Sequence, residues 1–329
     1  MEKILFICAT PLQLLIASQI LKKNRYKRNN CHLLYVVHSN NNKHNYYFNK
    51  FSNLFFKSIL LEYDGNPIKA MHYLRTQGLH RFYNSIYLAT ISFRFFQFLL
   101  SKTTHQTLNT FDDGTANILP SSTFYVDELG LKRKIKDEIY KLIGNRHPTA
   151  YIKEKTVRHY TIYKNTLNIV SSPVFLELFD NESMNPSLSK KSEHATVFLG
   201  SCIDSIIANE KHRDKLISRL KYFLLNPPHQ TLYYLPHPLD EKMDIPFLEA
   251  SETHLIAEDF IKNLLTKYEI VLLIGFSSSA QLNLFETKRI RNICLTSKLL
   301  NEHFNELALI MEKMGASIHS IDPPKDDET

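Results

Sequence analysis

Residues 4–21 read ILFICATPLQLLIASQIL, and this stretch decides the fold. The run Ile4–Thr10 is short and almost continuously apolar, as expected of a strand that is buried on both faces of a parallel sheet. Pro11 follows where proline is favoured, in the first turn of a helix, and the apolar residues after it recur at helical spacing. The stretch therefore predicts a strand, a tight turn and a helix. We expect no signal peptide or membrane span, because polar residues interrupt the run and a span needs ~20 apolar residues.

The same alternation continues through the first half of the chain. We expect strands at 32–39, 58–63, 107–111 and 159–164, and helical segments at 69–102 and 131–143. Strands that alternate with helices are typical of a parallel α/β sheet. In such sheets ligands bind beyond the carboxyl ends of the strands, so the residues directly after each strand are the first candidates for a site.

The pattern restarts after a polar, aperiodic segment at 178–194, which we interpret as a linker. Strands are expected at 195–199, 231–235, 269–274 and 291–296, and helices at 206–225, 258–266 and 301–314. A chain of 329 residues is long enough to form two domains. The sequence therefore predicts two Rossmann-like α/β domains, 1–178 and 179–329, that face each other across a substrate cleft.

Composition narrows the function classes. The formal net charge of +7 and the basic cluster at 22–28 would suit an anionic partner, such as lipid head groups, a charged glycolipid or nucleic acid. A solvated loop explains that cluster slightly better. The four cysteines form no Cys-x-x-Cys pair, which indicates a reducing compartment without a disulfide framework or a zinc site. No motif typical of dinucleotide, P-loop or serine-hydrolase sites is present.

Two adjacent acids, Asp112 and Asp113, follow the strand expected at 107–111, and Gly114 permits a sharp turn after them. Adjacent side chains on an extended segment point to opposite faces, so only one acid can face a cleft well. The other acid would cap the next turn. A metal-binding pair is a second explanation, weakened by the absence of a third acid nearby.

His237 follows the strand expected at 231–235 and lies between Pro236 and Pro238. Two flanking prolines restrict the backbone and hold the imidazole in place. A protonated histidine can donate to phosphate oxygens and protonate a leaving phosphate near neutral pH. Because of its place after a strand, we favour this role over that of a histidine in a rigid surface turn.

Hydroxyl and carboxylate side chains are the remaining candidates in the second half. Ser277, Ser278 and Ser279 follow the strand expected at 269–274, where hydroxyl and backbone N–H groups can hold a phosphate or simply cap a helix. Ser201 follows the strand at 195–199. Glu258 begins a helix, where it could accept hydrogen bonds from a ribose, although interaction with the helix dipole explains it better.

The order of these motifs, Asp-Asp-Gly, then His-Pro, then serines, resembles that of the bacterial sialyltransferases. The opening segment Cys8-Ala9-Thr10-Pro11-Leu12-Gln13 is similar to the first strand and turn of glycosyltransferase family 52, which contains lipooligosaccharide sialyltransferases. The resemblance implies a GT-B type fold, CMP-sialic acid as the donor, and inversion without a cofactor or metal.

The resemblance also implies roles for residues. Asp113 would be the general base and His237 the acid at the leaving phosphate. Donor binding would fall to Ser201, His237 with Pro238, Glu258, Ser277, Ser278 and Ser279, with two of the three adjacent serines on the phosphate. Thr10, Gln13, Asp112 and Gly114 would bind the acceptor or line the site.

The expected reaction moves sialic acid to a terminal galactose of a lipooligosaccharide or related glycan, with an α-2,3 linkage. Two alternatives stay open: a family 52 enzyme that uses another donor, such as a UDP-hexose, and a basic binding protein without catalysis. We expect no nucleic-acid partner and a cytoplasmic location. Peripheral contact with the inner membrane, through the segment 81–102, and a homodimer are also left open.

Overall fold

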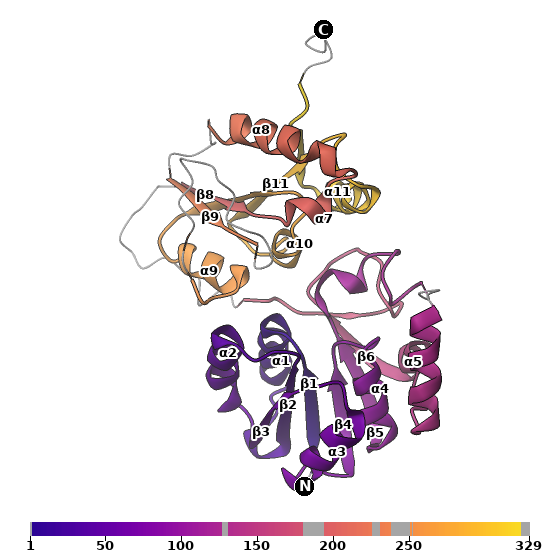
Figure 1. The fold of residues 1–329 in the computed structure, drawn as a ribbon. Coiled ribbons are helices and arrows are strands. Elements are labelled where there is room, and N and C mark those ends of the chain that lie inside the picture. Colours follow the sequence, from indigo (N-terminus) through magenta and orange to yellow (C-terminus); the bar gives the residue numbers. More distant parts are fainter. Residues whose placement is uncertain are drawn as a thin grey trace. The chain divides into compact units, whose positions relative to one another are not determined.

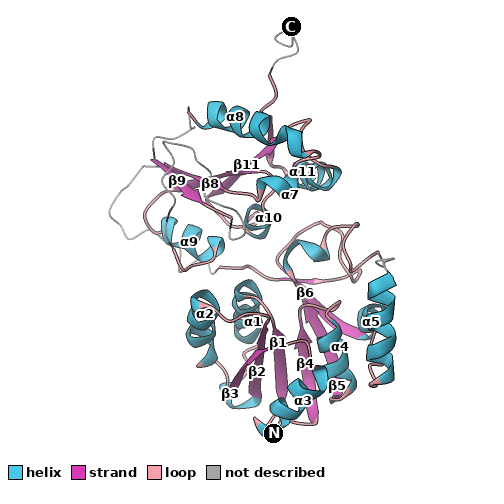
Figure 2. Cartoon of the chain, viewed as in Figure 1, coloured by secondary structure: helices cyan, strands magenta, loops and turns pink. Residues whose placement is uncertain are grey.

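The computed structural model describes residues 2–126, 131–179, 194–225, 231–237, 251 and 253–323, with only the backbone described at 131–133. The chain divides into two compact units, Met1–Leu178 and Phe179–Thr329. Each unit is a parallel sheet with helices packed on it (Figures 1 and 2). The segment expected to be a linker, 178–194, lies almost entirely outside the described residues.

The first unit contains seven described strands and six described helices. Its strands are β1 (Ile4–Cys8), β2 (Cys31–Val37), β3 (Lys57–Glu62), β4 (Phe82–Leu88), β5 (Thr104–Phe111), β6 (Thr156–Thr161) and β7 (Val174–Phe175). Its helices are α1 (Pro11–Lys23), α2 (Asn42–Ser52), α3 (Pro67–Thr76), α4 (Arg94–Ser101), α5 (Leu131–Leu142) and α6 (Thr149–Lys155). The short 3-10 helices η1 (Arg28–Asn30) and η2 (Gly114–Asn117) complete the described elements.

All the strand pairs of this sheet are parallel, and the strand order is β3-β2-β1-β4-β5-β6-β7. The chain runs outward from β1 to β3 and returns to place β4 on the other side of β1. Right-handed crossovers in the two directions put α1 and α2 on one face and α4 on the other (Figure 1). The order reverses between β1 and β4, and ligands bind at this point of a doubly wound sheet.

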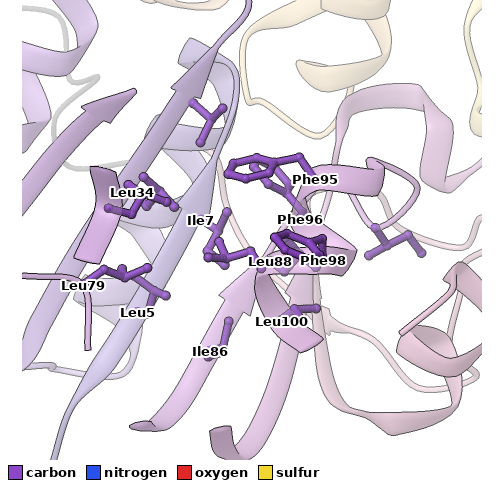
Figure 3. Close-up of a cluster of buried hydrophobic side chains, with 14 of the residues drawn as sticks. Leu5, Ile7, Leu34, Leu79, Ile86, Leu88, Phe95, Phe96, Phe98 and Leu100 are labelled. Atoms are coloured by element: carbon purple, nitrogen blue, oxygen red, sulfur yellow. The ribbon is translucent and has the colours of Figure 1, made fainter. Parts of the chain in front are cut away.

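The core explains why the strands are continuously apolar in sequence. Every residue of β1 and β2 is buried, because helices cover both faces of the sheet. On one face Leu5 and Ile7 of β1 pack with the aromatic residues of α4, among them Phe95 and Phe96 (Figure 3). The strands expected at 32–39, 58–63, 107–111 and 159–164 are confirmed within three residues at each end.

The second unit is built in the same way. Its strands are β8 (His194–Leu199), β9 (Thr231–Leu235), β10 (Ile270–Gly275), β11 (Ile290–Thr296) and β12 (Ser317–Ser320). Its helices are α7 (Ile203–Ile206), α8 (Arg213–Leu224), α9 (Ala257–Leu264), α10 (Ser279–Asn283) and α11 (Glu302–Met314), with the 3-10 helix η4 (Glu210–His212) before α8. The sheet order is β12-β11-β10-β8-β9, and every pair is parallel. Here the order reverses between β8 and β10, the second such point in the chain.

One sequence prediction was wrong in kind. The segment 69–102, expected to be helical throughout, forms α3, β4 and α4. The run FYNSIYL at 82–88 is rich in aromatic residues, which suit strands, and it pairs with both β1 and β5. The aromatic residues of α4 belong to the core, so the segment 81–102 is largely buried as expected, although it forms a strand and a helix and not one amphipathic helix.

Smaller differences concern the second unit and four elements that we did not expect. The helix expected at 206–225 is divided into α7, η4 and α8. Helices α2 and α6 and strands β7 and β12 were not predicted. Among the described residues, no helix combines the length and apolarity needed to cross a bilayer.

We predict that Phe96→Ala lowers the free energy of unfolding of the first unit by about 3–5 kcal/mol, because it removes a fully buried ring from the core shown in Figure 3. Urea denaturation followed by fluorescence would measure the loss. The matched control is Phe56→Ala, since Phe56 is 60% exposed and its loss should cost within about 0.5 kcal/mol. Equal losses in the two variants would contradict the assignment of this core.

Candidate active site

Gln13 links three parts of the first unit at the point where its strand order reverses. It lies in the first turn of α1, is fully buried, and its Oε1 accepts a hydrogen bond from the backbone N–H of Ala9 at 2.5 Å. Its Nε2 donates to Thr90 Oγ1 at 3.0 Å and to Asp113 Oδ1. These partners directly follow β1, β4 and β5, so one side chain ties the carboxyl ends of three neighbouring strands together.

Asp113 is the partly buried carboxylate of this cluster. Burial raises the pKa of its carboxyl above the usual value, while hydrogen bonds from Thr90 and Gln13 lower it and the negative charge of Asp112 raises it further. The net direction is upward. A carboxylate whose pKa is raised in this way is a stronger base than one in water, which suits a group that accepts a proton from a substrate.

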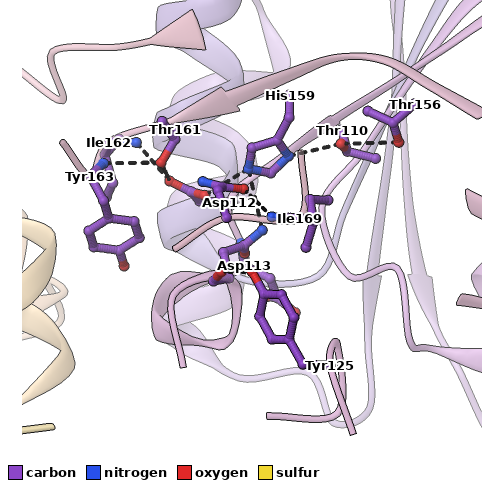
Figure 4. Close-up of polar contacts among 12 residues, drawn as sticks. Thr110, Asp112, Asp113, Tyr125, Thr156, His159, Thr161, Ile162, Tyr163 and Ile169 are labelled. Carbon is purple, nitrogen blue, oxygen red and sulfur yellow. Dashed lines mark hydrogen bonds and ion pairs between the residues drawn. The ribbon is translucent and has the colours of Figure 1, made fainter. Parts of the chain in front are cut away.

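Asp112 is fully buried and has a different role. One carboxylate oxygen lies 3.0 Å from His159 Nε2, and the other accepts from Thr161 Oγ1 at 2.8 Å and the backbone N–H of Ile162 at 2.7 Å (Figure 4). His159 Nδ1 contacts Thr110 Oγ1 at 2.8 Å. Asp112 therefore holds the end of β6 against the end of β5, and it does not face the same side as Asp113.

The turn after the two acids is built by Gly114 and Asn117. Gly114 has φ +65°, a left-handed conformation that side chains rarely adopt, and it begins η2. Asn117 Oδ1 accepts the backbone N–H of Asp113 at 2.7 Å. Neither acid side chain caps η2, so the turn-capping role considered for one of them is wrong. Thr10 instead caps α1, where its hydroxyl accepts from the backbone N–H of Gln13 at 3.3 Å.

In the second unit the carboxyl ends of β8 and β9 come close together at Gly200. A Cβ on Gly200 would lie 3.0 Å from the backbone N of His237 and 3.1 Å from the carbonyl oxygen of Leu235. The backbone N–H of Gly200 donates to that same carbonyl at 2.8 Å. Glycine is needed here because the segment that carries His237 packs directly on the segment that leads to Ser201. Pro238 lies outside the described residues.

The three adjacent serines are not equivalent. Ser277 has φ +51° and is buried, with its Oγ 3.0 Å from Cys294 Sγ, so its hydroxyl points into the core. Ser278 is the N-cap of α10, and it exchanges hydrogen bonds with Gln281 in a capping box. Ser279 is exposed in the first turn of α10. Of the three hydroxyls, those of Ser278 and Ser279 are the ones at the protein surface.

Glu258 lies in the first turn of α9 and is buried. Its Oε1 accepts a hydrogen bond from Asn283 Nδ2, on α10, at 2.7 Å. The pair ties α9 to α10. Among the described residues, no group of three or more His, Cys, Asp or Glu side chains is placed to hold a metal ion.

Several residues of these clusters were missed from the sequence. Thr90, Asn117 and His159 support the two acids, and Asn283 supports Glu258. His159 lay inside a correctly expected strand, but nothing in the sequence paired it with Asp112, 47 positions away. Thr90 was missed because the sequence predicted a helix over 69–102, so that Thr90 was not recognised as a residue that follows a strand.

Comparison with known proteins places the chain in a family. The sequence model of glycosyltransferase family 52 matches residues 28–299, which is more than half of the chain. The chain belongs to glycosyltransferase family 52. As a family 52 enzyme it is a transferase that acts with a sugar donor and an acceptor.

Relatives of this family 52 chain match it over nearly its full length. A protein of Pasteurella multocida (strain Pm70), named CMP-N-acetylneuraminate:beta-galactoside alpha-2,3-sialyltransferase, is 30% identical over 324 residues and covers 96% of this chain and 99% of its own. A protein of Haemophilus influenzae, named N-acetyllactosaminide alpha-2,3-sialyltransferase, is 26% identical and covers 84% of this chain and 86% of its own.

Solved structures support the fold alone. A sialyltransferase from Photobacterium damsela has a TM-score of 0.50 and 11% identity, and the match covers 97% of this chain and 82% of that one. An Arabidopsis thaliana enzyme complexed with UDP-L-rhamnose has the same TM-score and identity, and the match covers 99% and 88%. Together with the two doubly wound sheets, these similarities confirm the expected GT-B type fold.

We predict that Thr90→Val moves the acidic limb of the kcat/KM profile of the family 52 enzyme to higher pH. Valine cannot donate the hydrogen bond that lowers the pKa of Asp113, so the carboxyl would stay protonated, and inactive as a base, up to a higher pH. The matched control is Thr90→Ser, which keeps the hydroxyl and should keep the limb near its original position. Identical profiles for the two variants would contradict the role of this hydroxyl.

Proposed function

We propose that this protein is an inverting sialyltransferase that moves sialic acid from CMP-sialic acid to a terminal galactose. Family membership and the names of the Pasteurella and Haemophilus relatives support the reaction class and an α-2,3 linkage. The observation that carries the proposal is the state of Asp113. Of the two acids in the Asp-Asp-Gly motif, Asp112 forms hydrogen bonds that join β5 to β6, whereas Asp113 does not. The pKa of Asp113 is also raised.

In the proposed mechanism Asp113 accepts the proton of the galactose O3 hydroxyl. That oxygen attacks C2 of sialic acid from the face opposite the phosphate, and the bond from C2 to the CMP phosphate breaks with inversion. Gln13 positions the base by a direct hydrogen bond, and Asp112 does so by holding the end of β5 against β6. The raised pKa makes the ionised carboxylate of Asp113 a better proton acceptor than that of an ordinary aspartate.

On the donor side, His237 donates a proton to the leaving phosphate, and Ser278 and Ser279 bind its oxygens. This assignment is supported by the position of these residues at the carboxyl ends of β9 and β10, beside the point where the strand order reverses. The proposed reaction uses no metal, because His237 and the two serines stabilise the negative charge of the leaving phosphate by donating a proton and hydrogen bonds. Ser201 and Glu258 are proposed to contact the nucleotide, with Glu258 on the ribose.

The proposed acceptor is a galactose-ended glycan of a lipooligosaccharide or a related glycolipid. We place the reaction in the cytoplasm or at the inner membrane, where the four cysteines, all free in the structure, would stay reduced. The main alternative is transfer from a UDP-hexose, which the same fold could bind.

The test is an assay of purified protein with CMP-sialic acid and fluorescent lactose, separated by HPLC without added metal. We expect sialylated lactose and free CMP, and a turnover at least about 10²-fold lower for Asp113→Asn, since a positioned base contributes 10²–10⁴-fold. A pKa raised in the folded state means that the ionised form is disfavoured there, so the uncharged variant should lose no stability at neutral pH. A normal rate for Asp113→Asn would remove it as the base.

Donor identity is tested by thermal shift in the same preparation. A nucleotide at 100 times its Kd stabilises the protein by about 2.7 kcal/mol, so CMP and UDP are readily told apart. A shift with UDP alone, and no product from CMP-sialic acid, would favour the UDP-hexose alternative.

The serines provide a matched pair of variants. We predict that Ser279→Ala weakens CMP binding roughly tenfold or more, because a hydrogen bond to a charged group contributes about 1.5–3 kcal/mol. Ser277→Ala should bind CMP normally, since that hydroxyl points toward Cys294 inside the core. Titration calorimetry measures both affinities. The reverse order of effects would overturn the assignment of Ser279 to the phosphate.

A further inference from the structure

The outer face of α5 is an exposed apolar stripe. Ile135, Ile139 and Leu142 are 53%, 51% and 86% exposed, and their spacing of four and three residues places them on one side of the helix. The opposite side is anchored to the first unit. The hydroxyl of Tyr140 contacts that of Tyr63 at 2.7 Å, and Asp137 pairs with Arg94, on α4, at 2.5 Å.

A basic, partly apolar hollow adjoins the carboxyl-terminal end of α5. It has a volume of about 540 Å³ and lies among α3, α4 and Ile143, the residue that follows α5. Its cations are Arg75, Arg81 and Lys102, and its apolar lining includes Ile68, Met71 and Phe98. Ile68 is itself 61% exposed, so the apolar surface extends from α5 across the hollow to α3.

Charges around this surface are mainly positive. On α5, Lys134, Lys136 and Lys141 are exposed, and Lys134 and Lys136 flank the apolar stripe on its two sides. The acids there are offset, since Glu138 pairs with Lys141 at 2.6 Å and Asp137 pairs with Arg94. We call the stripe, these lysines and the hollow the α5 surface.

We infer that the α5 surface binds an anionic lipid bilayer, with the apolar stripe in the interface and the cations among the head groups. A helix with an apolar face flanked by Lys and Arg is the arrangement that lies flat in a membrane interface. Basic residues near an anionic surface add attraction, and long lysine side chains extend their charges toward water while their stems stay apolar.

Charge favours a lipid surface over a second copy of this chain. A symmetric dimer through the α5 surface would bring this mainly basic patch against its own copy, because a two-fold contact uses the same patch twice. An anionic bilayer instead offers complementary charge over the whole area.

The α5 surface is also separate from the candidate active site. Arg81 precedes β4 and Lys102 precedes β5, so the hollow lies toward the amino ends of these strands, whereas Thr90 and Asp113 follow their carboxyl ends. Lipid binding would therefore leave the base accessible. The segment 81–102, for which membrane contact was left open, contributes only its two terminal cations and Phe98 to this surface.

The test is flotation of the full-length protein with vesicles. Vesicles of equal parts phosphatidylglycerol and phosphatidylcholine should carry the protein at low salt and release most of it at high salt, while pure phosphatidylcholine should bind it weakly. The charge-reversal variant Arg81→Glu with Lys136→Glu should lower binding to the anionic vesicles by about tenfold or more. Its control is Lys215→Glu, an exposed lysine of α8, which should bind as before.

The apolar part is tested with Ile135→Ser, Ile139→Ser and Leu142→Ser combined, against Leu309→Ser, which alters an exposed leucine of α11. We expect loss of flotation in the triple variant alone, with transfer to soluble lactose unchanged, which also shows that the variant is folded. The inference is overturned if vesicle binding is equal in all variants, or if it is the same for neutral and anionic lipid. It is also overturned if the triple variant loses only self-association in sedimentation. None of these outcomes depends on the identity of the sugar donor.

Discussion

The side-chain amide of Gln13 is the interaction on which the candidate base depends. Its oxygen is held by the N–H of Ala9, which leaves both N–H groups to point at Thr90 and Asp113. Because these partners follow three neighbouring parallel strands, the amide sets the spacing of the strand ends as well as the orientation of the carboxylate. The carboxylate also lies beside the first turn of α1, where the helix dipole favours a negative charge. Burial raises the pKa of Asp113, and the hydrogen bonds from Thr90 and Gln13 act in the opposite direction.

The two adjacent acids of the Asp-Asp-Gly motif have different structural environments. Successive side chains of an extended segment point in opposite directions, so Asp112 turns into the sheet and Asp113 turns out of it. Asp112 has three hydrogen-bond partners from β6 and the residue after it, and a buried charge is tolerated only when it is paired in this way. The inner acid therefore fixes the strand end from which the outer acid projects. The serines of the second unit divide in the same manner, with Ser277 turned inward and Ser279 outward.

Much of this could be predicted from the sequence, because buried parallel strands are apolar along their whole length and end abruptly at polar residues. That pattern located β1, β5, β8, β9 and β10, and with them the candidate residues at their carboxyl ends. It failed at 69–102, where the aromatic residues of β4 and α4 run together and the apolar period is ambiguous. Thr90 was lost with β4. His159 and Asn283 could not be found from the sequence, since their importance depends on contacts with residues far away in the chain.

The two units are both doubly wound parallel sheets, but they place different side chains at the point where the strand order reverses. In each, the strand order reverses beside the first strand, and the neighbouring loops diverge and leave room for a ligand. The first unit fills that position with a carboxylate held by amide and hydroxyl donors, an arrangement suited to accepting a proton. The second surrounds it with hydroxyls, a helix start and a histidine beside Gly200, groups that donate hydrogen bonds to an anion. In the proposed mechanism, proton acceptance by Asp113 and anion binding by the second unit are the two requirements of a displacement at the nucleotide sugar, and each requirement is met by side chains of a different unit.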